Sequence, residues 1–354
     1  MPDSSAAPRP LISVIMPVLN EASHIEKAIG SLLQQEAQEF DFEILALDGK
    51  STDGTMQKLA SLAAAEPRLR VLTNEKRTAP AAFNLGLRAA KGEYVCIMGA
   101  HADYERNYLA VCYRELLARG AIGCSGHAVT CPADSSAQAR LVAWVLGHPF
   151  GTSASSSRTQ AEGYVDSIAF PLFVKQALLD AGGYRENLTR NQDNDMNERL
   201  RARGHKLYLT WKTSALYYPK KTIRELLQYG FRNGYWNVIS LKVHPASMKT
   251  RHFVPFVFVM ALLVSLGLAF ASAFLNAPRG LLWGPLLVLL GLHFGVGAVA
   301  AAQTALRQKQ WLALALPPLF FAFHTAYGLG SLWGFLSSGQ KGRAEAAWQR
   351  ADCV

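Results

Sequence analysis

A turn-rich segment of the sequence, DGKSTDG over residues 48–54, directly follows the apolar run 42–47. A carboxylate such as Asp48 at the end of a strand can accept hydrogen bonds from a ribose or from a uracil edge. Glycines in such a loop let a ligand approach the backbone closely. Alternatively, Asp48 and Asp53 only cap turns and the following helix. The segment alone leaves both interpretations open.

A second polar group, GAHAD over residues 99–103, follows the apolar run 94–98. His101 and Asp103 could ligate a divalent cation that bridges a diphosphate. Mg²⁺ and Mn²⁺ favour oxygen ligands, and Mn²⁺ also accepts imidazole. The simpler interpretation is a loop histidine and a helix-capping aspartate.

The third group is NQDNDMNERL over residues 191–200, at the start of a predicted charged helix over 191–203. The helix dipole favours ionised carboxylates at this position. A general base that activates a sugar hydroxyl must be a positioned carboxylate or histidine. We predict this chemical role for Asp193 and a helix salt bridge to Arg199 for Asp195. Simple helix capping is the alternative.

A fourth group, QYGFR over residues 228–232 with Trp236 behind it, precedes the most apolar part of the chain. Gln228 and Arg232 could line a tunnel for a sugar acceptor. Equally, the segment could be an interfacial helix that holds its aromatic and basic residues at the level of lipid headgroups.

The elements that must position these groups alternate between strands and helices. We predict strands over 11–18, 42–47, 70–73 and 94–98, and helices over 25–33, 56–65 and 79–90. This alternation predicts an α/β fold with a doubly wound, mostly parallel sheet, in which ligands bind beyond the carboxyl ends of the strands. The alternation ends near residue 123, after which we predict a strand over 165–174 and a helix over 176–181.

Three apolar segments over 253–276, 281–305 and 311–336 are each long enough to cross a bilayer. The preceding residues 220–251 hold seven basic residues and one acid, Glu225. This imbalance favours a cytoplasmic location for that flank and contact with anionic headgroups. The net charge of +10 is therefore read as a membrane signature; the sequence holds no base-reading motif that would indicate nucleic acid.

Three crossings would, however, place the basic residues Lys341, Arg343 and Arg350 on the outer side, against the positive-inside tendency. Pro317-Pro318 interrupts the last segment, which could make it re-entrant. The expected organisation is a disordered N-terminus over 1–10, a catalytic domain over 11–245, a membrane domain of about three hydrophobic helices over 246–340 and a polar tail over 341–354.

The order of four segments resembles the family 2 inverting glycosyltransferases with the GT-A fold. The segments are VIMPVLNEASHIEKAI, LALDGKSTDGT, NEKRTAPAAFNLGLRAAKGEYVCIMGAH and NQDNDMNERLRARGHKL. Residues 11–245 are most similar to the succinoglycan-biosynthesis ExoA-like branch, which builds exopolysaccharide repeat units on lipid carriers. The resemblance implies a Rossmann-like GT-A domain, a nucleotide-sugar donor and, for a membrane-bound member, C-terminal transmembrane helices.

The resemblance also implies roles for individual residues. Asp48 matches the aspartate that contacts uridine, and Asp193 matches the catalytic base of the "ED" motif. The residues expected to bind the nucleotide sugar are Pro17, Asn20, Glu21, Asp48, Arg77, Asn84, Gly99 and Ala100. Those expected on the acceptor side or near the membrane are Asp166, Gln228, Arg232 and Trp236.

Two positions depart from the family pattern. The metal motif of the family reads Asp-x-Asp, or Asp-x-His in this branch, but Gly99 replaces its first acid here. His101 and Asp103 remain as the expected ligands of a divalent cation, Mg²⁺ or Mn²⁺. The "ED" motif likewise begins with the amide Gln192.

The sequence as a whole therefore predicts a hexosyltransferase of the inner cell membrane with a cytoplasmic catalytic domain. It would transfer a sugar from a nucleotide sugar, UDP-linked by resemblance, to a lipid-linked saccharide during exopolysaccharide or cell-surface glycan synthesis. Two alternatives stay open, a polyprenyl-phosphate sugar synthase and an inactive membrane-bound homologue that serves as a binding partner. A processive synthase is disfavoured because the Gln-x-x-Arg-Trp signature is absent.

Overall fold

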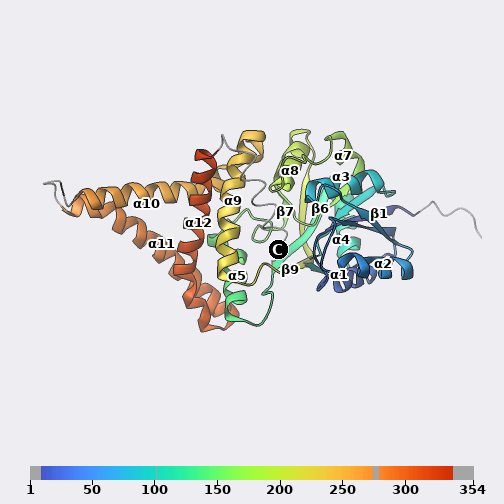
Figure 1. The fold of residues 1–354 in the computed structure, drawn as a ribbon, viewed down its shortest axis with the longest axis horizontal. Coiled ribbons are helices and arrows are strands. Elements are labelled where there is room, and N and C mark those ends of the chain that lie inside the picture. The colour runs from blue at the N-terminus through green and yellow to red at the C-terminus, as the bar shows by residue number, and fades with distance from the viewer. Residues whose placement is uncertain (1–8, 101, 273, 275–278, 338–354) are drawn as a thin grey trace, which may run out of the picture. The chain divides into compact units, whose positions relative to one another are not determined.

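The computed structural model describes residues 9–100, 102–272, 274 and 279–337. Within these, the chain forms two compact units, one of residues 9–129 and 161–217 and the other of residues 130–160 and 218–337 (Figure 1). Residues 1–8, the expected polar tail over 341–354 and His101 lie outside the described residues. The units do not divide at residue 245, because the segments 130–160 and 218–245 pack with the long apolar helices.

The N-terminal half of the sheet in the first unit is parallel. Strands β3, β2, β1 and β4 lie side by side in that order, and the neighbouring strands are parallel. The elements are β1 (Leu11–Val18), α1 (Ile25–Leu33), β2 (Asp41–Asp48), α2 (Thr55–Ala65), β3 (Leu69–Thr73), α3 (Ala79–Ala89) and β4 (Tyr94–Ile97). The apolar runs of β1 and β2 are covered on both faces, as is usual for parallel strands. The predicted fold class is confirmed.

The rest of the sheet makes it mixed. Beyond β4 the order continues β8, β6, β9 and β5, with β7 paired to β9. Strand β6 runs in the direction of β4, since both are antiparallel to β8. The elements are β5 (Ala102–Tyr104), α4 (Tyr108–Ala118), β6 (Gly123–Thr130), β7 (Gly163–Tyr164), β8 (Leu172–Val174), α7 (Lys175–Asp180), α8 (Gln192–Ala202) and β9 (Leu207–Tyr217).

The predicted strand over 165–174 is wrong for most of its length, because only Leu172–Val174 is a strand. Phe170 has a φ of 53°, which a strand cannot contain, and the following Pro171 has no backbone N–H to donate. The chain therefore turns before β8, and this turn becomes part of the site described below.

Two apolar cores cover the two faces of the sheet. Val14 and Met16 of β1 lie in the core under α1, α2 and α4, whereas Ile15 lies in the core under α3, α7 and α8. Successive side chains of a strand point to opposite faces, so one strand serves both cores. Helix α8 is thus anchored on the sheet by its buried Met196 and Leu200.

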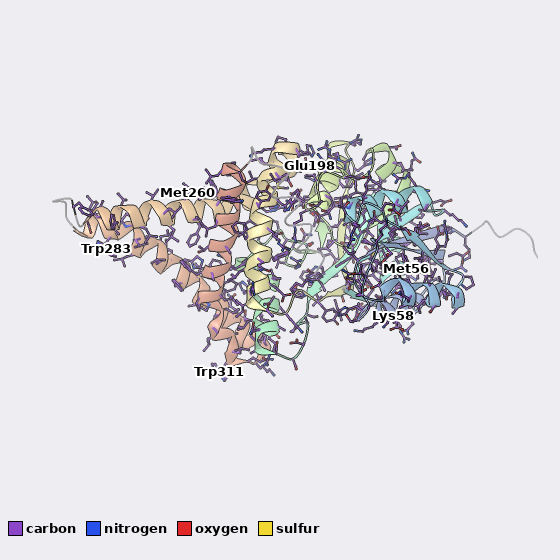
Figure 2. All side chains as sticks on the ribbon, in the orientation of Figure 1. Met56, Lys58, Glu198, Met260, Trp283 and Trp311 are labelled. Carbon is purple, nitrogen blue, oxygen red and sulfur yellow. The ribbon has the colours of Figure 1, made fainter. Side chains whose placement is uncertain are left out.

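The second unit is helical. Its elements are α5 (Ala137–Gly147), α6 (Pro149–Thr152), α9 (Ile223–Val243), α10 (Val254–Ala271), α11 (Arg279–Gln308) and α12 (Leu316–Leu336). Three stretches, Thr250–Ala271, Gly280–Gln308 and Trp311–Leu336, are long and apolar enough to cross a membrane. Figure 2 shows side chains such as Met260 and Trp283 projecting from α10 and α11.

Candidate functional site

The loops after β1, β2 and β3 meet at one edge of the sheet. The side-chain oxygen of Asn20 accepts a hydrogen bond from the Thr52 amide at 2.9 Å, and the backbone amide of Asn20 donates to Ser51 Oγ at 2.8 Å. Gly49 lies where the loops converge, because a Cβ placed on it would stand 3.5 Å from both Val18 O and Arg77 Cα. The predicted edge site is therefore assembled from three separate loops.

Asp48 ends β2 and is completely buried. Its Oδ2 accepts a hydrogen bond from the Ser51 amide at 3.1 Å. Its Oδ1 has no hydrogen-bond partner among the described residues. A buried carboxylate oxygen without a donor is costly, so this atom is suited to accept a hydrogen bond from a ligand.

Of the two aspartates Asp48 and Asp53, Asp53 has the structural role of capping a turn and the following helix. Its carboxylate accepts hydrogen bonds from the amide of Ala22 at 3.0 Å and from the amide of Thr55 at 3.1 Å. Burial alone would raise the pKa of Asp53, but the hydrogen bonds from the Thr55 side chain and the Ala22 amide outweigh it and lower the pKa. Asp53 thus joins the loop after β1 to the start of α2.

Each of these three loops also contains a non-glycine residue with a left-handed backbone. The φ angles are 54° at Asn20, 60° at Lys50 and 56° at Arg77. Such residues are uncommon, and they cluster at functional sites where surrounding contacts hold them in place. Glu21 follows Asn20 and is buried, and its backbone amide donates to Thr55 Oγ1 at 2.8 Å.

The first unit also contains a pocket of about 210 Å³. Pro17 of β1 and Gly99 after β4 line it, as do Gln192, Asp193 and Asn197 of α8. The remaining wall is mostly apolar and is formed by Phe83, Ile97, Met98, Ile168, Ala169, Phe170, Pro171, Phe173 and Tyr184. Three residues predicted from distant parts of the sequence, Pro17, Gly99 and Asp193, are thereby brought together.

Asp193 is exposed in the first turn of α8 and lines this pocket. Its Oδ1 accepts a hydrogen bond from the Asn194 amide at 2.9 Å. The helix N-terminus stabilises the ionised carboxylate. Burial, followed by the nearby charge of Asp193, raises the pKa of Tyr184, so the tyrosine stays neutral beside the carboxylate.

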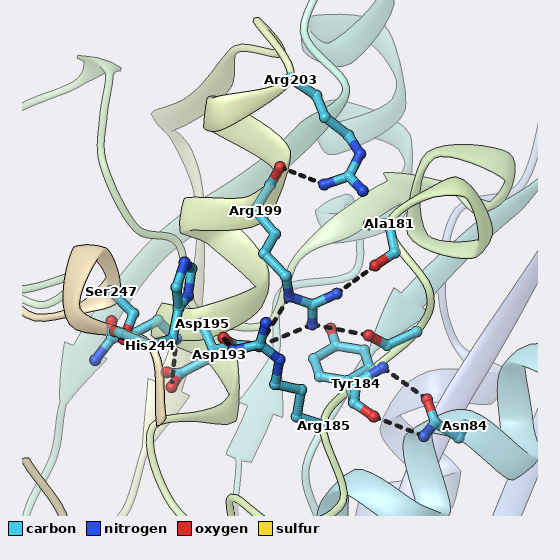
Figure 3. Close-up of polar contacts among 12 residues, drawn as sticks. Asn84, Ala181, Tyr184, Arg185, Asp193, Asp195, Arg199, Arg203, His244 and Ser247 are labelled. Atoms are coloured by element: carbon cyan, nitrogen blue, oxygen red, sulfur yellow. Dashed lines mark hydrogen bonds and ion pairs between the residues drawn. The ribbon is translucent and has the colours of Figure 1, made fainter. Parts of the chain in front are cut away.

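Asp195 is fully buried, and the predicted salt bridge to Arg199 is confirmed (Figure 3). Arg199 Nη2 lies 2.8 Å from Asp195 Oδ2, and Arg185 Nη1 lies 3.0 Å from Asp195 Oδ1. Arg199 also donates to the carbonyl oxygens of Ala181 at 2.5 Å and Gly183 at 2.8 Å. The pair therefore fixes α8, and with it Asp193, against the loop over 181–185.

Asn84 of α3 holds the other side of that loop (Figure 3). Its Nδ2 donates to the carbonyl oxygen of Tyr184 at 2.8 Å, and its Oδ1 accepts from the Tyr184 amide at 2.7 Å. A second bond from Nδ2 reaches Glu186 Oε1 at 3.0 Å. Asn84 thus supports a pocket wall; its predicted contact with the nucleotide sugar stays a prediction.

Residues 13–166 match the family described as "Glycosyl transferase family 2". The chain carries a glycosyltransferase family 2 domain. This glycosyltransferase is 29% identical over 245 residues to the succinoglycan biosynthesis protein ExoA of Rhizobium meliloti (strain 1021), covering 68% of this chain and 73% of that protein.

A second relative of the glycosyltransferase comes from Methanococcus voltae and aligns over nearly the whole length. It is a dolichyl N-acetyl-alpha-D-glucosaminyl phosphate 3-beta-D-2,3-diacetamido-2,3-dideoxy-beta-D-glucuronosyltransferase, 24% identical over 342 residues, with 92% of this chain and 97% of that protein covered.

Among solved structures, the mannosyltransferase PcManGT from Pyrobaculum calidifontis, in complex with GDP-Man and Mn²⁺, superposes with a TM-score of 0.56 at 21% identity. The superposition covers 94% of this chain and 90% of that one. The GT-A fold of the glycosyltransferase is therefore confirmed.

The described part of the glycosyltransferase does not provide a complete set of ligands for the divalent cation that the family implies. Gly99 and Ala100 offer no side-chain ligand, and His101 lies outside the described residues. Asp103 lies on β5 with its Oδ2 2.5 Å from Lys27 Nζ. No three His, Cys, Asp or Glu side chains converge in the parts of the chain that the structure describes.

The residues predicted for the acceptor side fall in different places. Asp166 lies in the first unit and pairs with Arg201 at 3.1 Å. Gln228, Arg232 and Trp236 all lie on α9 of the second unit, where Gln228 is exposed and Trp236 is buried. Their predicted roles stay predictions.

Sequence reasoning missed several residues that shape the pocket of the glycosyltransferase. Phe170 and Pro171 form the turn before β8, and Tyr184 stands beside Asp193. A sequence signal for the loop that holds Tyr184 was present in the pair Gly182-Gly183, both of which have positive φ. That pair marks a tight loop of the kind that approaches another backbone closely.

Proposed function

We propose that the protein is a membrane-attached, inverting glycosyltransferase that moves a sugar from a nucleotide sugar to a lipid-linked saccharide. The observation that supports this most directly is the exposed carboxylate of Asp193 at a pocket whose wall includes Pro17 and Gly99 at the nucleotide edge of the sheet. The acceptor class rests on the Methanococcus voltae relative, whose name specifies a dolichyl phosphate sugar acceptor.

In this proposal the donor is a UDP-sugar and Asp48 is its anchor. The unpartnered Oδ1 of Asp48 would accept a hydrogen bond from the uracil or the ribose. Asn20, Glu21 and Arg77 hold the loops that surround the nucleotide, and Pro17 and Gly99 lie between the nucleotide and the reacting sugar.

Asp193 acts as the general base. It takes the proton from the acceptor hydroxyl, whose oxygen forms the new bond to the anomeric carbon from the face opposite the diphosphate. The bond between the anomeric carbon and the diphosphate oxygen breaks, and the diphosphate leaves with the electron pair. Attack from the opposite face inverts the configuration. Asp195 is excluded from this role because it is buried in ion pairs with Arg185 and Arg199.

Mg²⁺ or Mn²⁺ remains part of the proposal as a separate element. Because the described residues do not complete a metal site, no step above depends on a cation. A metal would have to be held by His101 and by the diphosphate itself. Activity that is unchanged in excess EDTA would remove His101 and the cation from the proposal.

The direct test is Asp193→Asn in a membrane preparation supplied with a panel of nucleotide sugars. Loss of a general base lowers the rate by about 10²–10⁴. Asp180→Asn, an exposed change at the end of α7, serves as the matched control and should keep full activity. Near-full sugar transfer by Asp193→Asn would refute the base assignment, and nucleotide-sugar binding without turnover by the unmodified protein would favour the inactive homologue.

Product analysis tests the remaining alternative. A single sugar on polyprenyl phosphate would identify a polyprenyl-phosphate sugar synthase. Extension of a lipid-linked saccharide would support the proposal. Attachment to the inner cell membrane, with the catalytic unit in the cytoplasm, is proposed from the three apolar helices and from the basic residues over 220–251.

A further inference from the structure

Helices α9 and α12 of the second unit lie side by side (Figure 1). A Cβ added to Gly234 of α9 would stand 1.9 Å from Tyr327 O, and one added to Gly330 of α12 would stand 1.9 Å from Phe231 O. Such contacts require the two backbones to touch, as small residues allow between helices. Asn237 Nδ2 also donates to the Tyr327 hydroxyl at 2.6 Å.

The two helices run in the same direction and in register. Near their starts, Leu226 of α9 shares an apolar core with Leu316 and Phe320 of α12. Near their ends, a Cβ on Gly334 would lie 2.9 Å from Val238 Cβ. Each level along α12 therefore corresponds to a level along α9, and the two helices must occupy the same depth in a membrane.

This coupling decides where α12 can lie. Helix α9 carries Arg224 and Glu225 near its start, Arg232 at its middle and Lys242 near its end. If α12 crossed the bilayer, α9 would cross with it and would carry these charges through the hydrocarbon. Ionisable groups at that depth are costly and rare. The apolar composition of α12 thus overstates its suitability as a crossing helix.

The surface of α12 supports a shallow position. Its large exposed apolar side chains are confined to the C-terminal part and are Leu329, Trp333, Phe335 and Leu336. Of these, Leu329, Trp333 and Leu336 follow the spacing i, i+4, i+7. This spacing places them on one stripe of the helix. The opposite flanks are covered, for example where Ser331 Oγ donates to Gly234 O at 3.1 Å.

Helices α10 and α11 have a different environment. Each of them contacts α12 at a different point. A Cβ on Gly328 of α12 would lie 2.2 Å from Pro255 O of α10, and one on Gly297 of α11 would lie 3.4 Å from Pro317 Cα of α12. Between these points, large apolar side chains of both helices are exposed, including Leu263, Val264, Leu266, Leu287, Val288 and Leu292.

The lengths of α10 and α11 match a crossing. With a rise of about 1.5 Å per residue, the 18 residues of α10 and the 30 residues of α11 extend about 27 and 45 Å. A hydrocarbon core is about 30 Å thick. Near the tip of this hairpin, Trp283 Nε1 donates to Ser272 Oγ at 3.0 Å (Figure 2). Tryptophan is enriched at membrane–water interfaces.

We propose that α10 and α11 alone cross the phospholipid bilayer, as a hairpin. Helices α9 and α12 then lie together in the headgroup layer, on the side of the bilayer where α10 begins and α11 ends. The inference rests on the membrane attachment in the proposed function, though not on the reaction. Two crossings place Lys341, Arg343 and Arg350 on the same side as the basic residues over 220–251. That arrangement removes the conflict with the positive-inside tendency that three crossings create.

The chain's own cysteines offer a test by labelling with a membrane-impermeant maleimide in sealed vesicles of known orientation. Cys96, Cys112 and Cys124 are buried, so a Cys131→Ser, Cys353→Ser protein should stay unlabelled and serves as the background. Three single-reporter proteins are compared, carrying native Cys353, Ser135→Cys at an exposed loop position, or Asn276→Cys in the sequence between α10 and α11.

The proposal expects the reporters at 353 and 135 to be labelled from one face and the reporter at 276 from the other. Labelling of 353 from the face opposite to 135 would indicate three crossings and overturn it. Labelling of 276 from the same face as 135 would show that the hairpin does not cross, and would overturn it as well. If the protein does not sediment with membranes at all, the membrane attachment in the proposed function fails too.

Discussion

The two units of the molecule distribute their apolar residues in opposite ways. In the first unit the apolar strands are covered on both faces, and the exposed large apolar side chains are scattered positions such as Leu117 and Leu179. In the second unit, α10 and α11 expose apolar side chains along most of their length. The difference indicates that the two units are folded for different surroundings, so one type of substitution should have different consequences in each.

The largest effect is expected inside the first unit, where Asp195→Asn removes the carboxylate partner of the buried Arg199. Breaking a buried ion pair from one side typically costs about 3–5 kcal/mol, because the other charge is left uncompensated. Asp193→Asn, an exposed change two residues earlier, should leave the unfolding free energy almost unchanged. Denaturant unfolding of the detergent-solubilised proteins measures both, and equal destabilisation would contradict the division of roles.

The comparison between units is tested most directly with three leucine-to-lysine changes at similarly exposed positions, Leu117, Leu263 and Leu329, which are 52%, 45% and 40% exposed. On α10, Leu263→Lys should disfavour insertion by about 2.5–3.5 kcal/mol, as a lysine does at the centre of a crossing helix. On α4, Leu117→Lys should be neutral, as surface changes usually are. Leu329→Lys on α12 should also be tolerated.

The fraction of each variant recovered in carbonate-washed membranes provides the measurement. A loss for Leu329→Lys as large as that for Leu263→Lys would place α12 at the same depth as α10. Such a result would count against the hairpin arrangement, while the contrast with Leu117→Lys would still separate the two units.

A smaller effect is expected at the nucleotide edge. Asp48→Asn should weaken UDP binding by about 1.5–3 kcal/mol, the usual contribution of a hydrogen bond to a charged group. Asp53→Asn is the matched control, because its carboxylate accepts hydrogen bonds from the Ala22 and Thr55 amides, so the change should affect stability more than affinity. Calorimetric titration of UDP into each protein decides, and an unchanged dissociation constant for Asp48→Asn would exclude it as the anchor.

The smallest effect concerns acid stability of the first unit. Burial alone would raise the pKa of Glu43, but hydrogen bonds from the Lys91 amide, Ser13 and Arg70 lower it below its usual value. A carboxyl whose pKa is lowered on folding stabilises the protein above its unfolded pKa and loses that contribution as pH falls through the folded pKa. Glu43→Gln should therefore flatten the decline in melting temperature below about pH 4.3. A parallel decline in both proteins would argue otherwise.

The parallel half of the sheet could be predicted because its signals are local. Strand β1 and helix α1 have the predicted bounds, since a continuous apolar run and a helical spacing each specify one element. Strand β9, LYLTWKTSALY, carries no comparable signal, because it mixes polar and apolar residues along an antiparallel part of the sheet. Its pairing depends on strands that are distant in sequence.

The site divides in the same way. The positions of Pro17, Gly99 and Asp193 followed from strand ends and a helix start, which the sequence marks. The turn at Phe170 and the loop that Arg199 holds through Ala181 and Gly183 could not be predicted, because they exist only once α8 is packed on the sheet. Likewise, the apolar content of α12 predicted a crossing, whereas its contacts with α9 are visible only in the folded unit.

The amide that stands in place of the first acid of the "ED" motif, Gln192, has a hydrogen-bond acceptor that the described residues leave unsatisfied. Gln192 Oε1 is buried at the pocket and has no hydrogen-bond donor within the described ranges. A sugar that brings a hydroxyl to this carbonyl would donate a hydrogen bond to it. A deoxygenated analogue would leave the carbonyl without a donor, which would cost about 1–3 kcal/mol of binding free energy. The pocket would then discriminate among sugars by what they lack, and deoxysugars would be its poorest substrates.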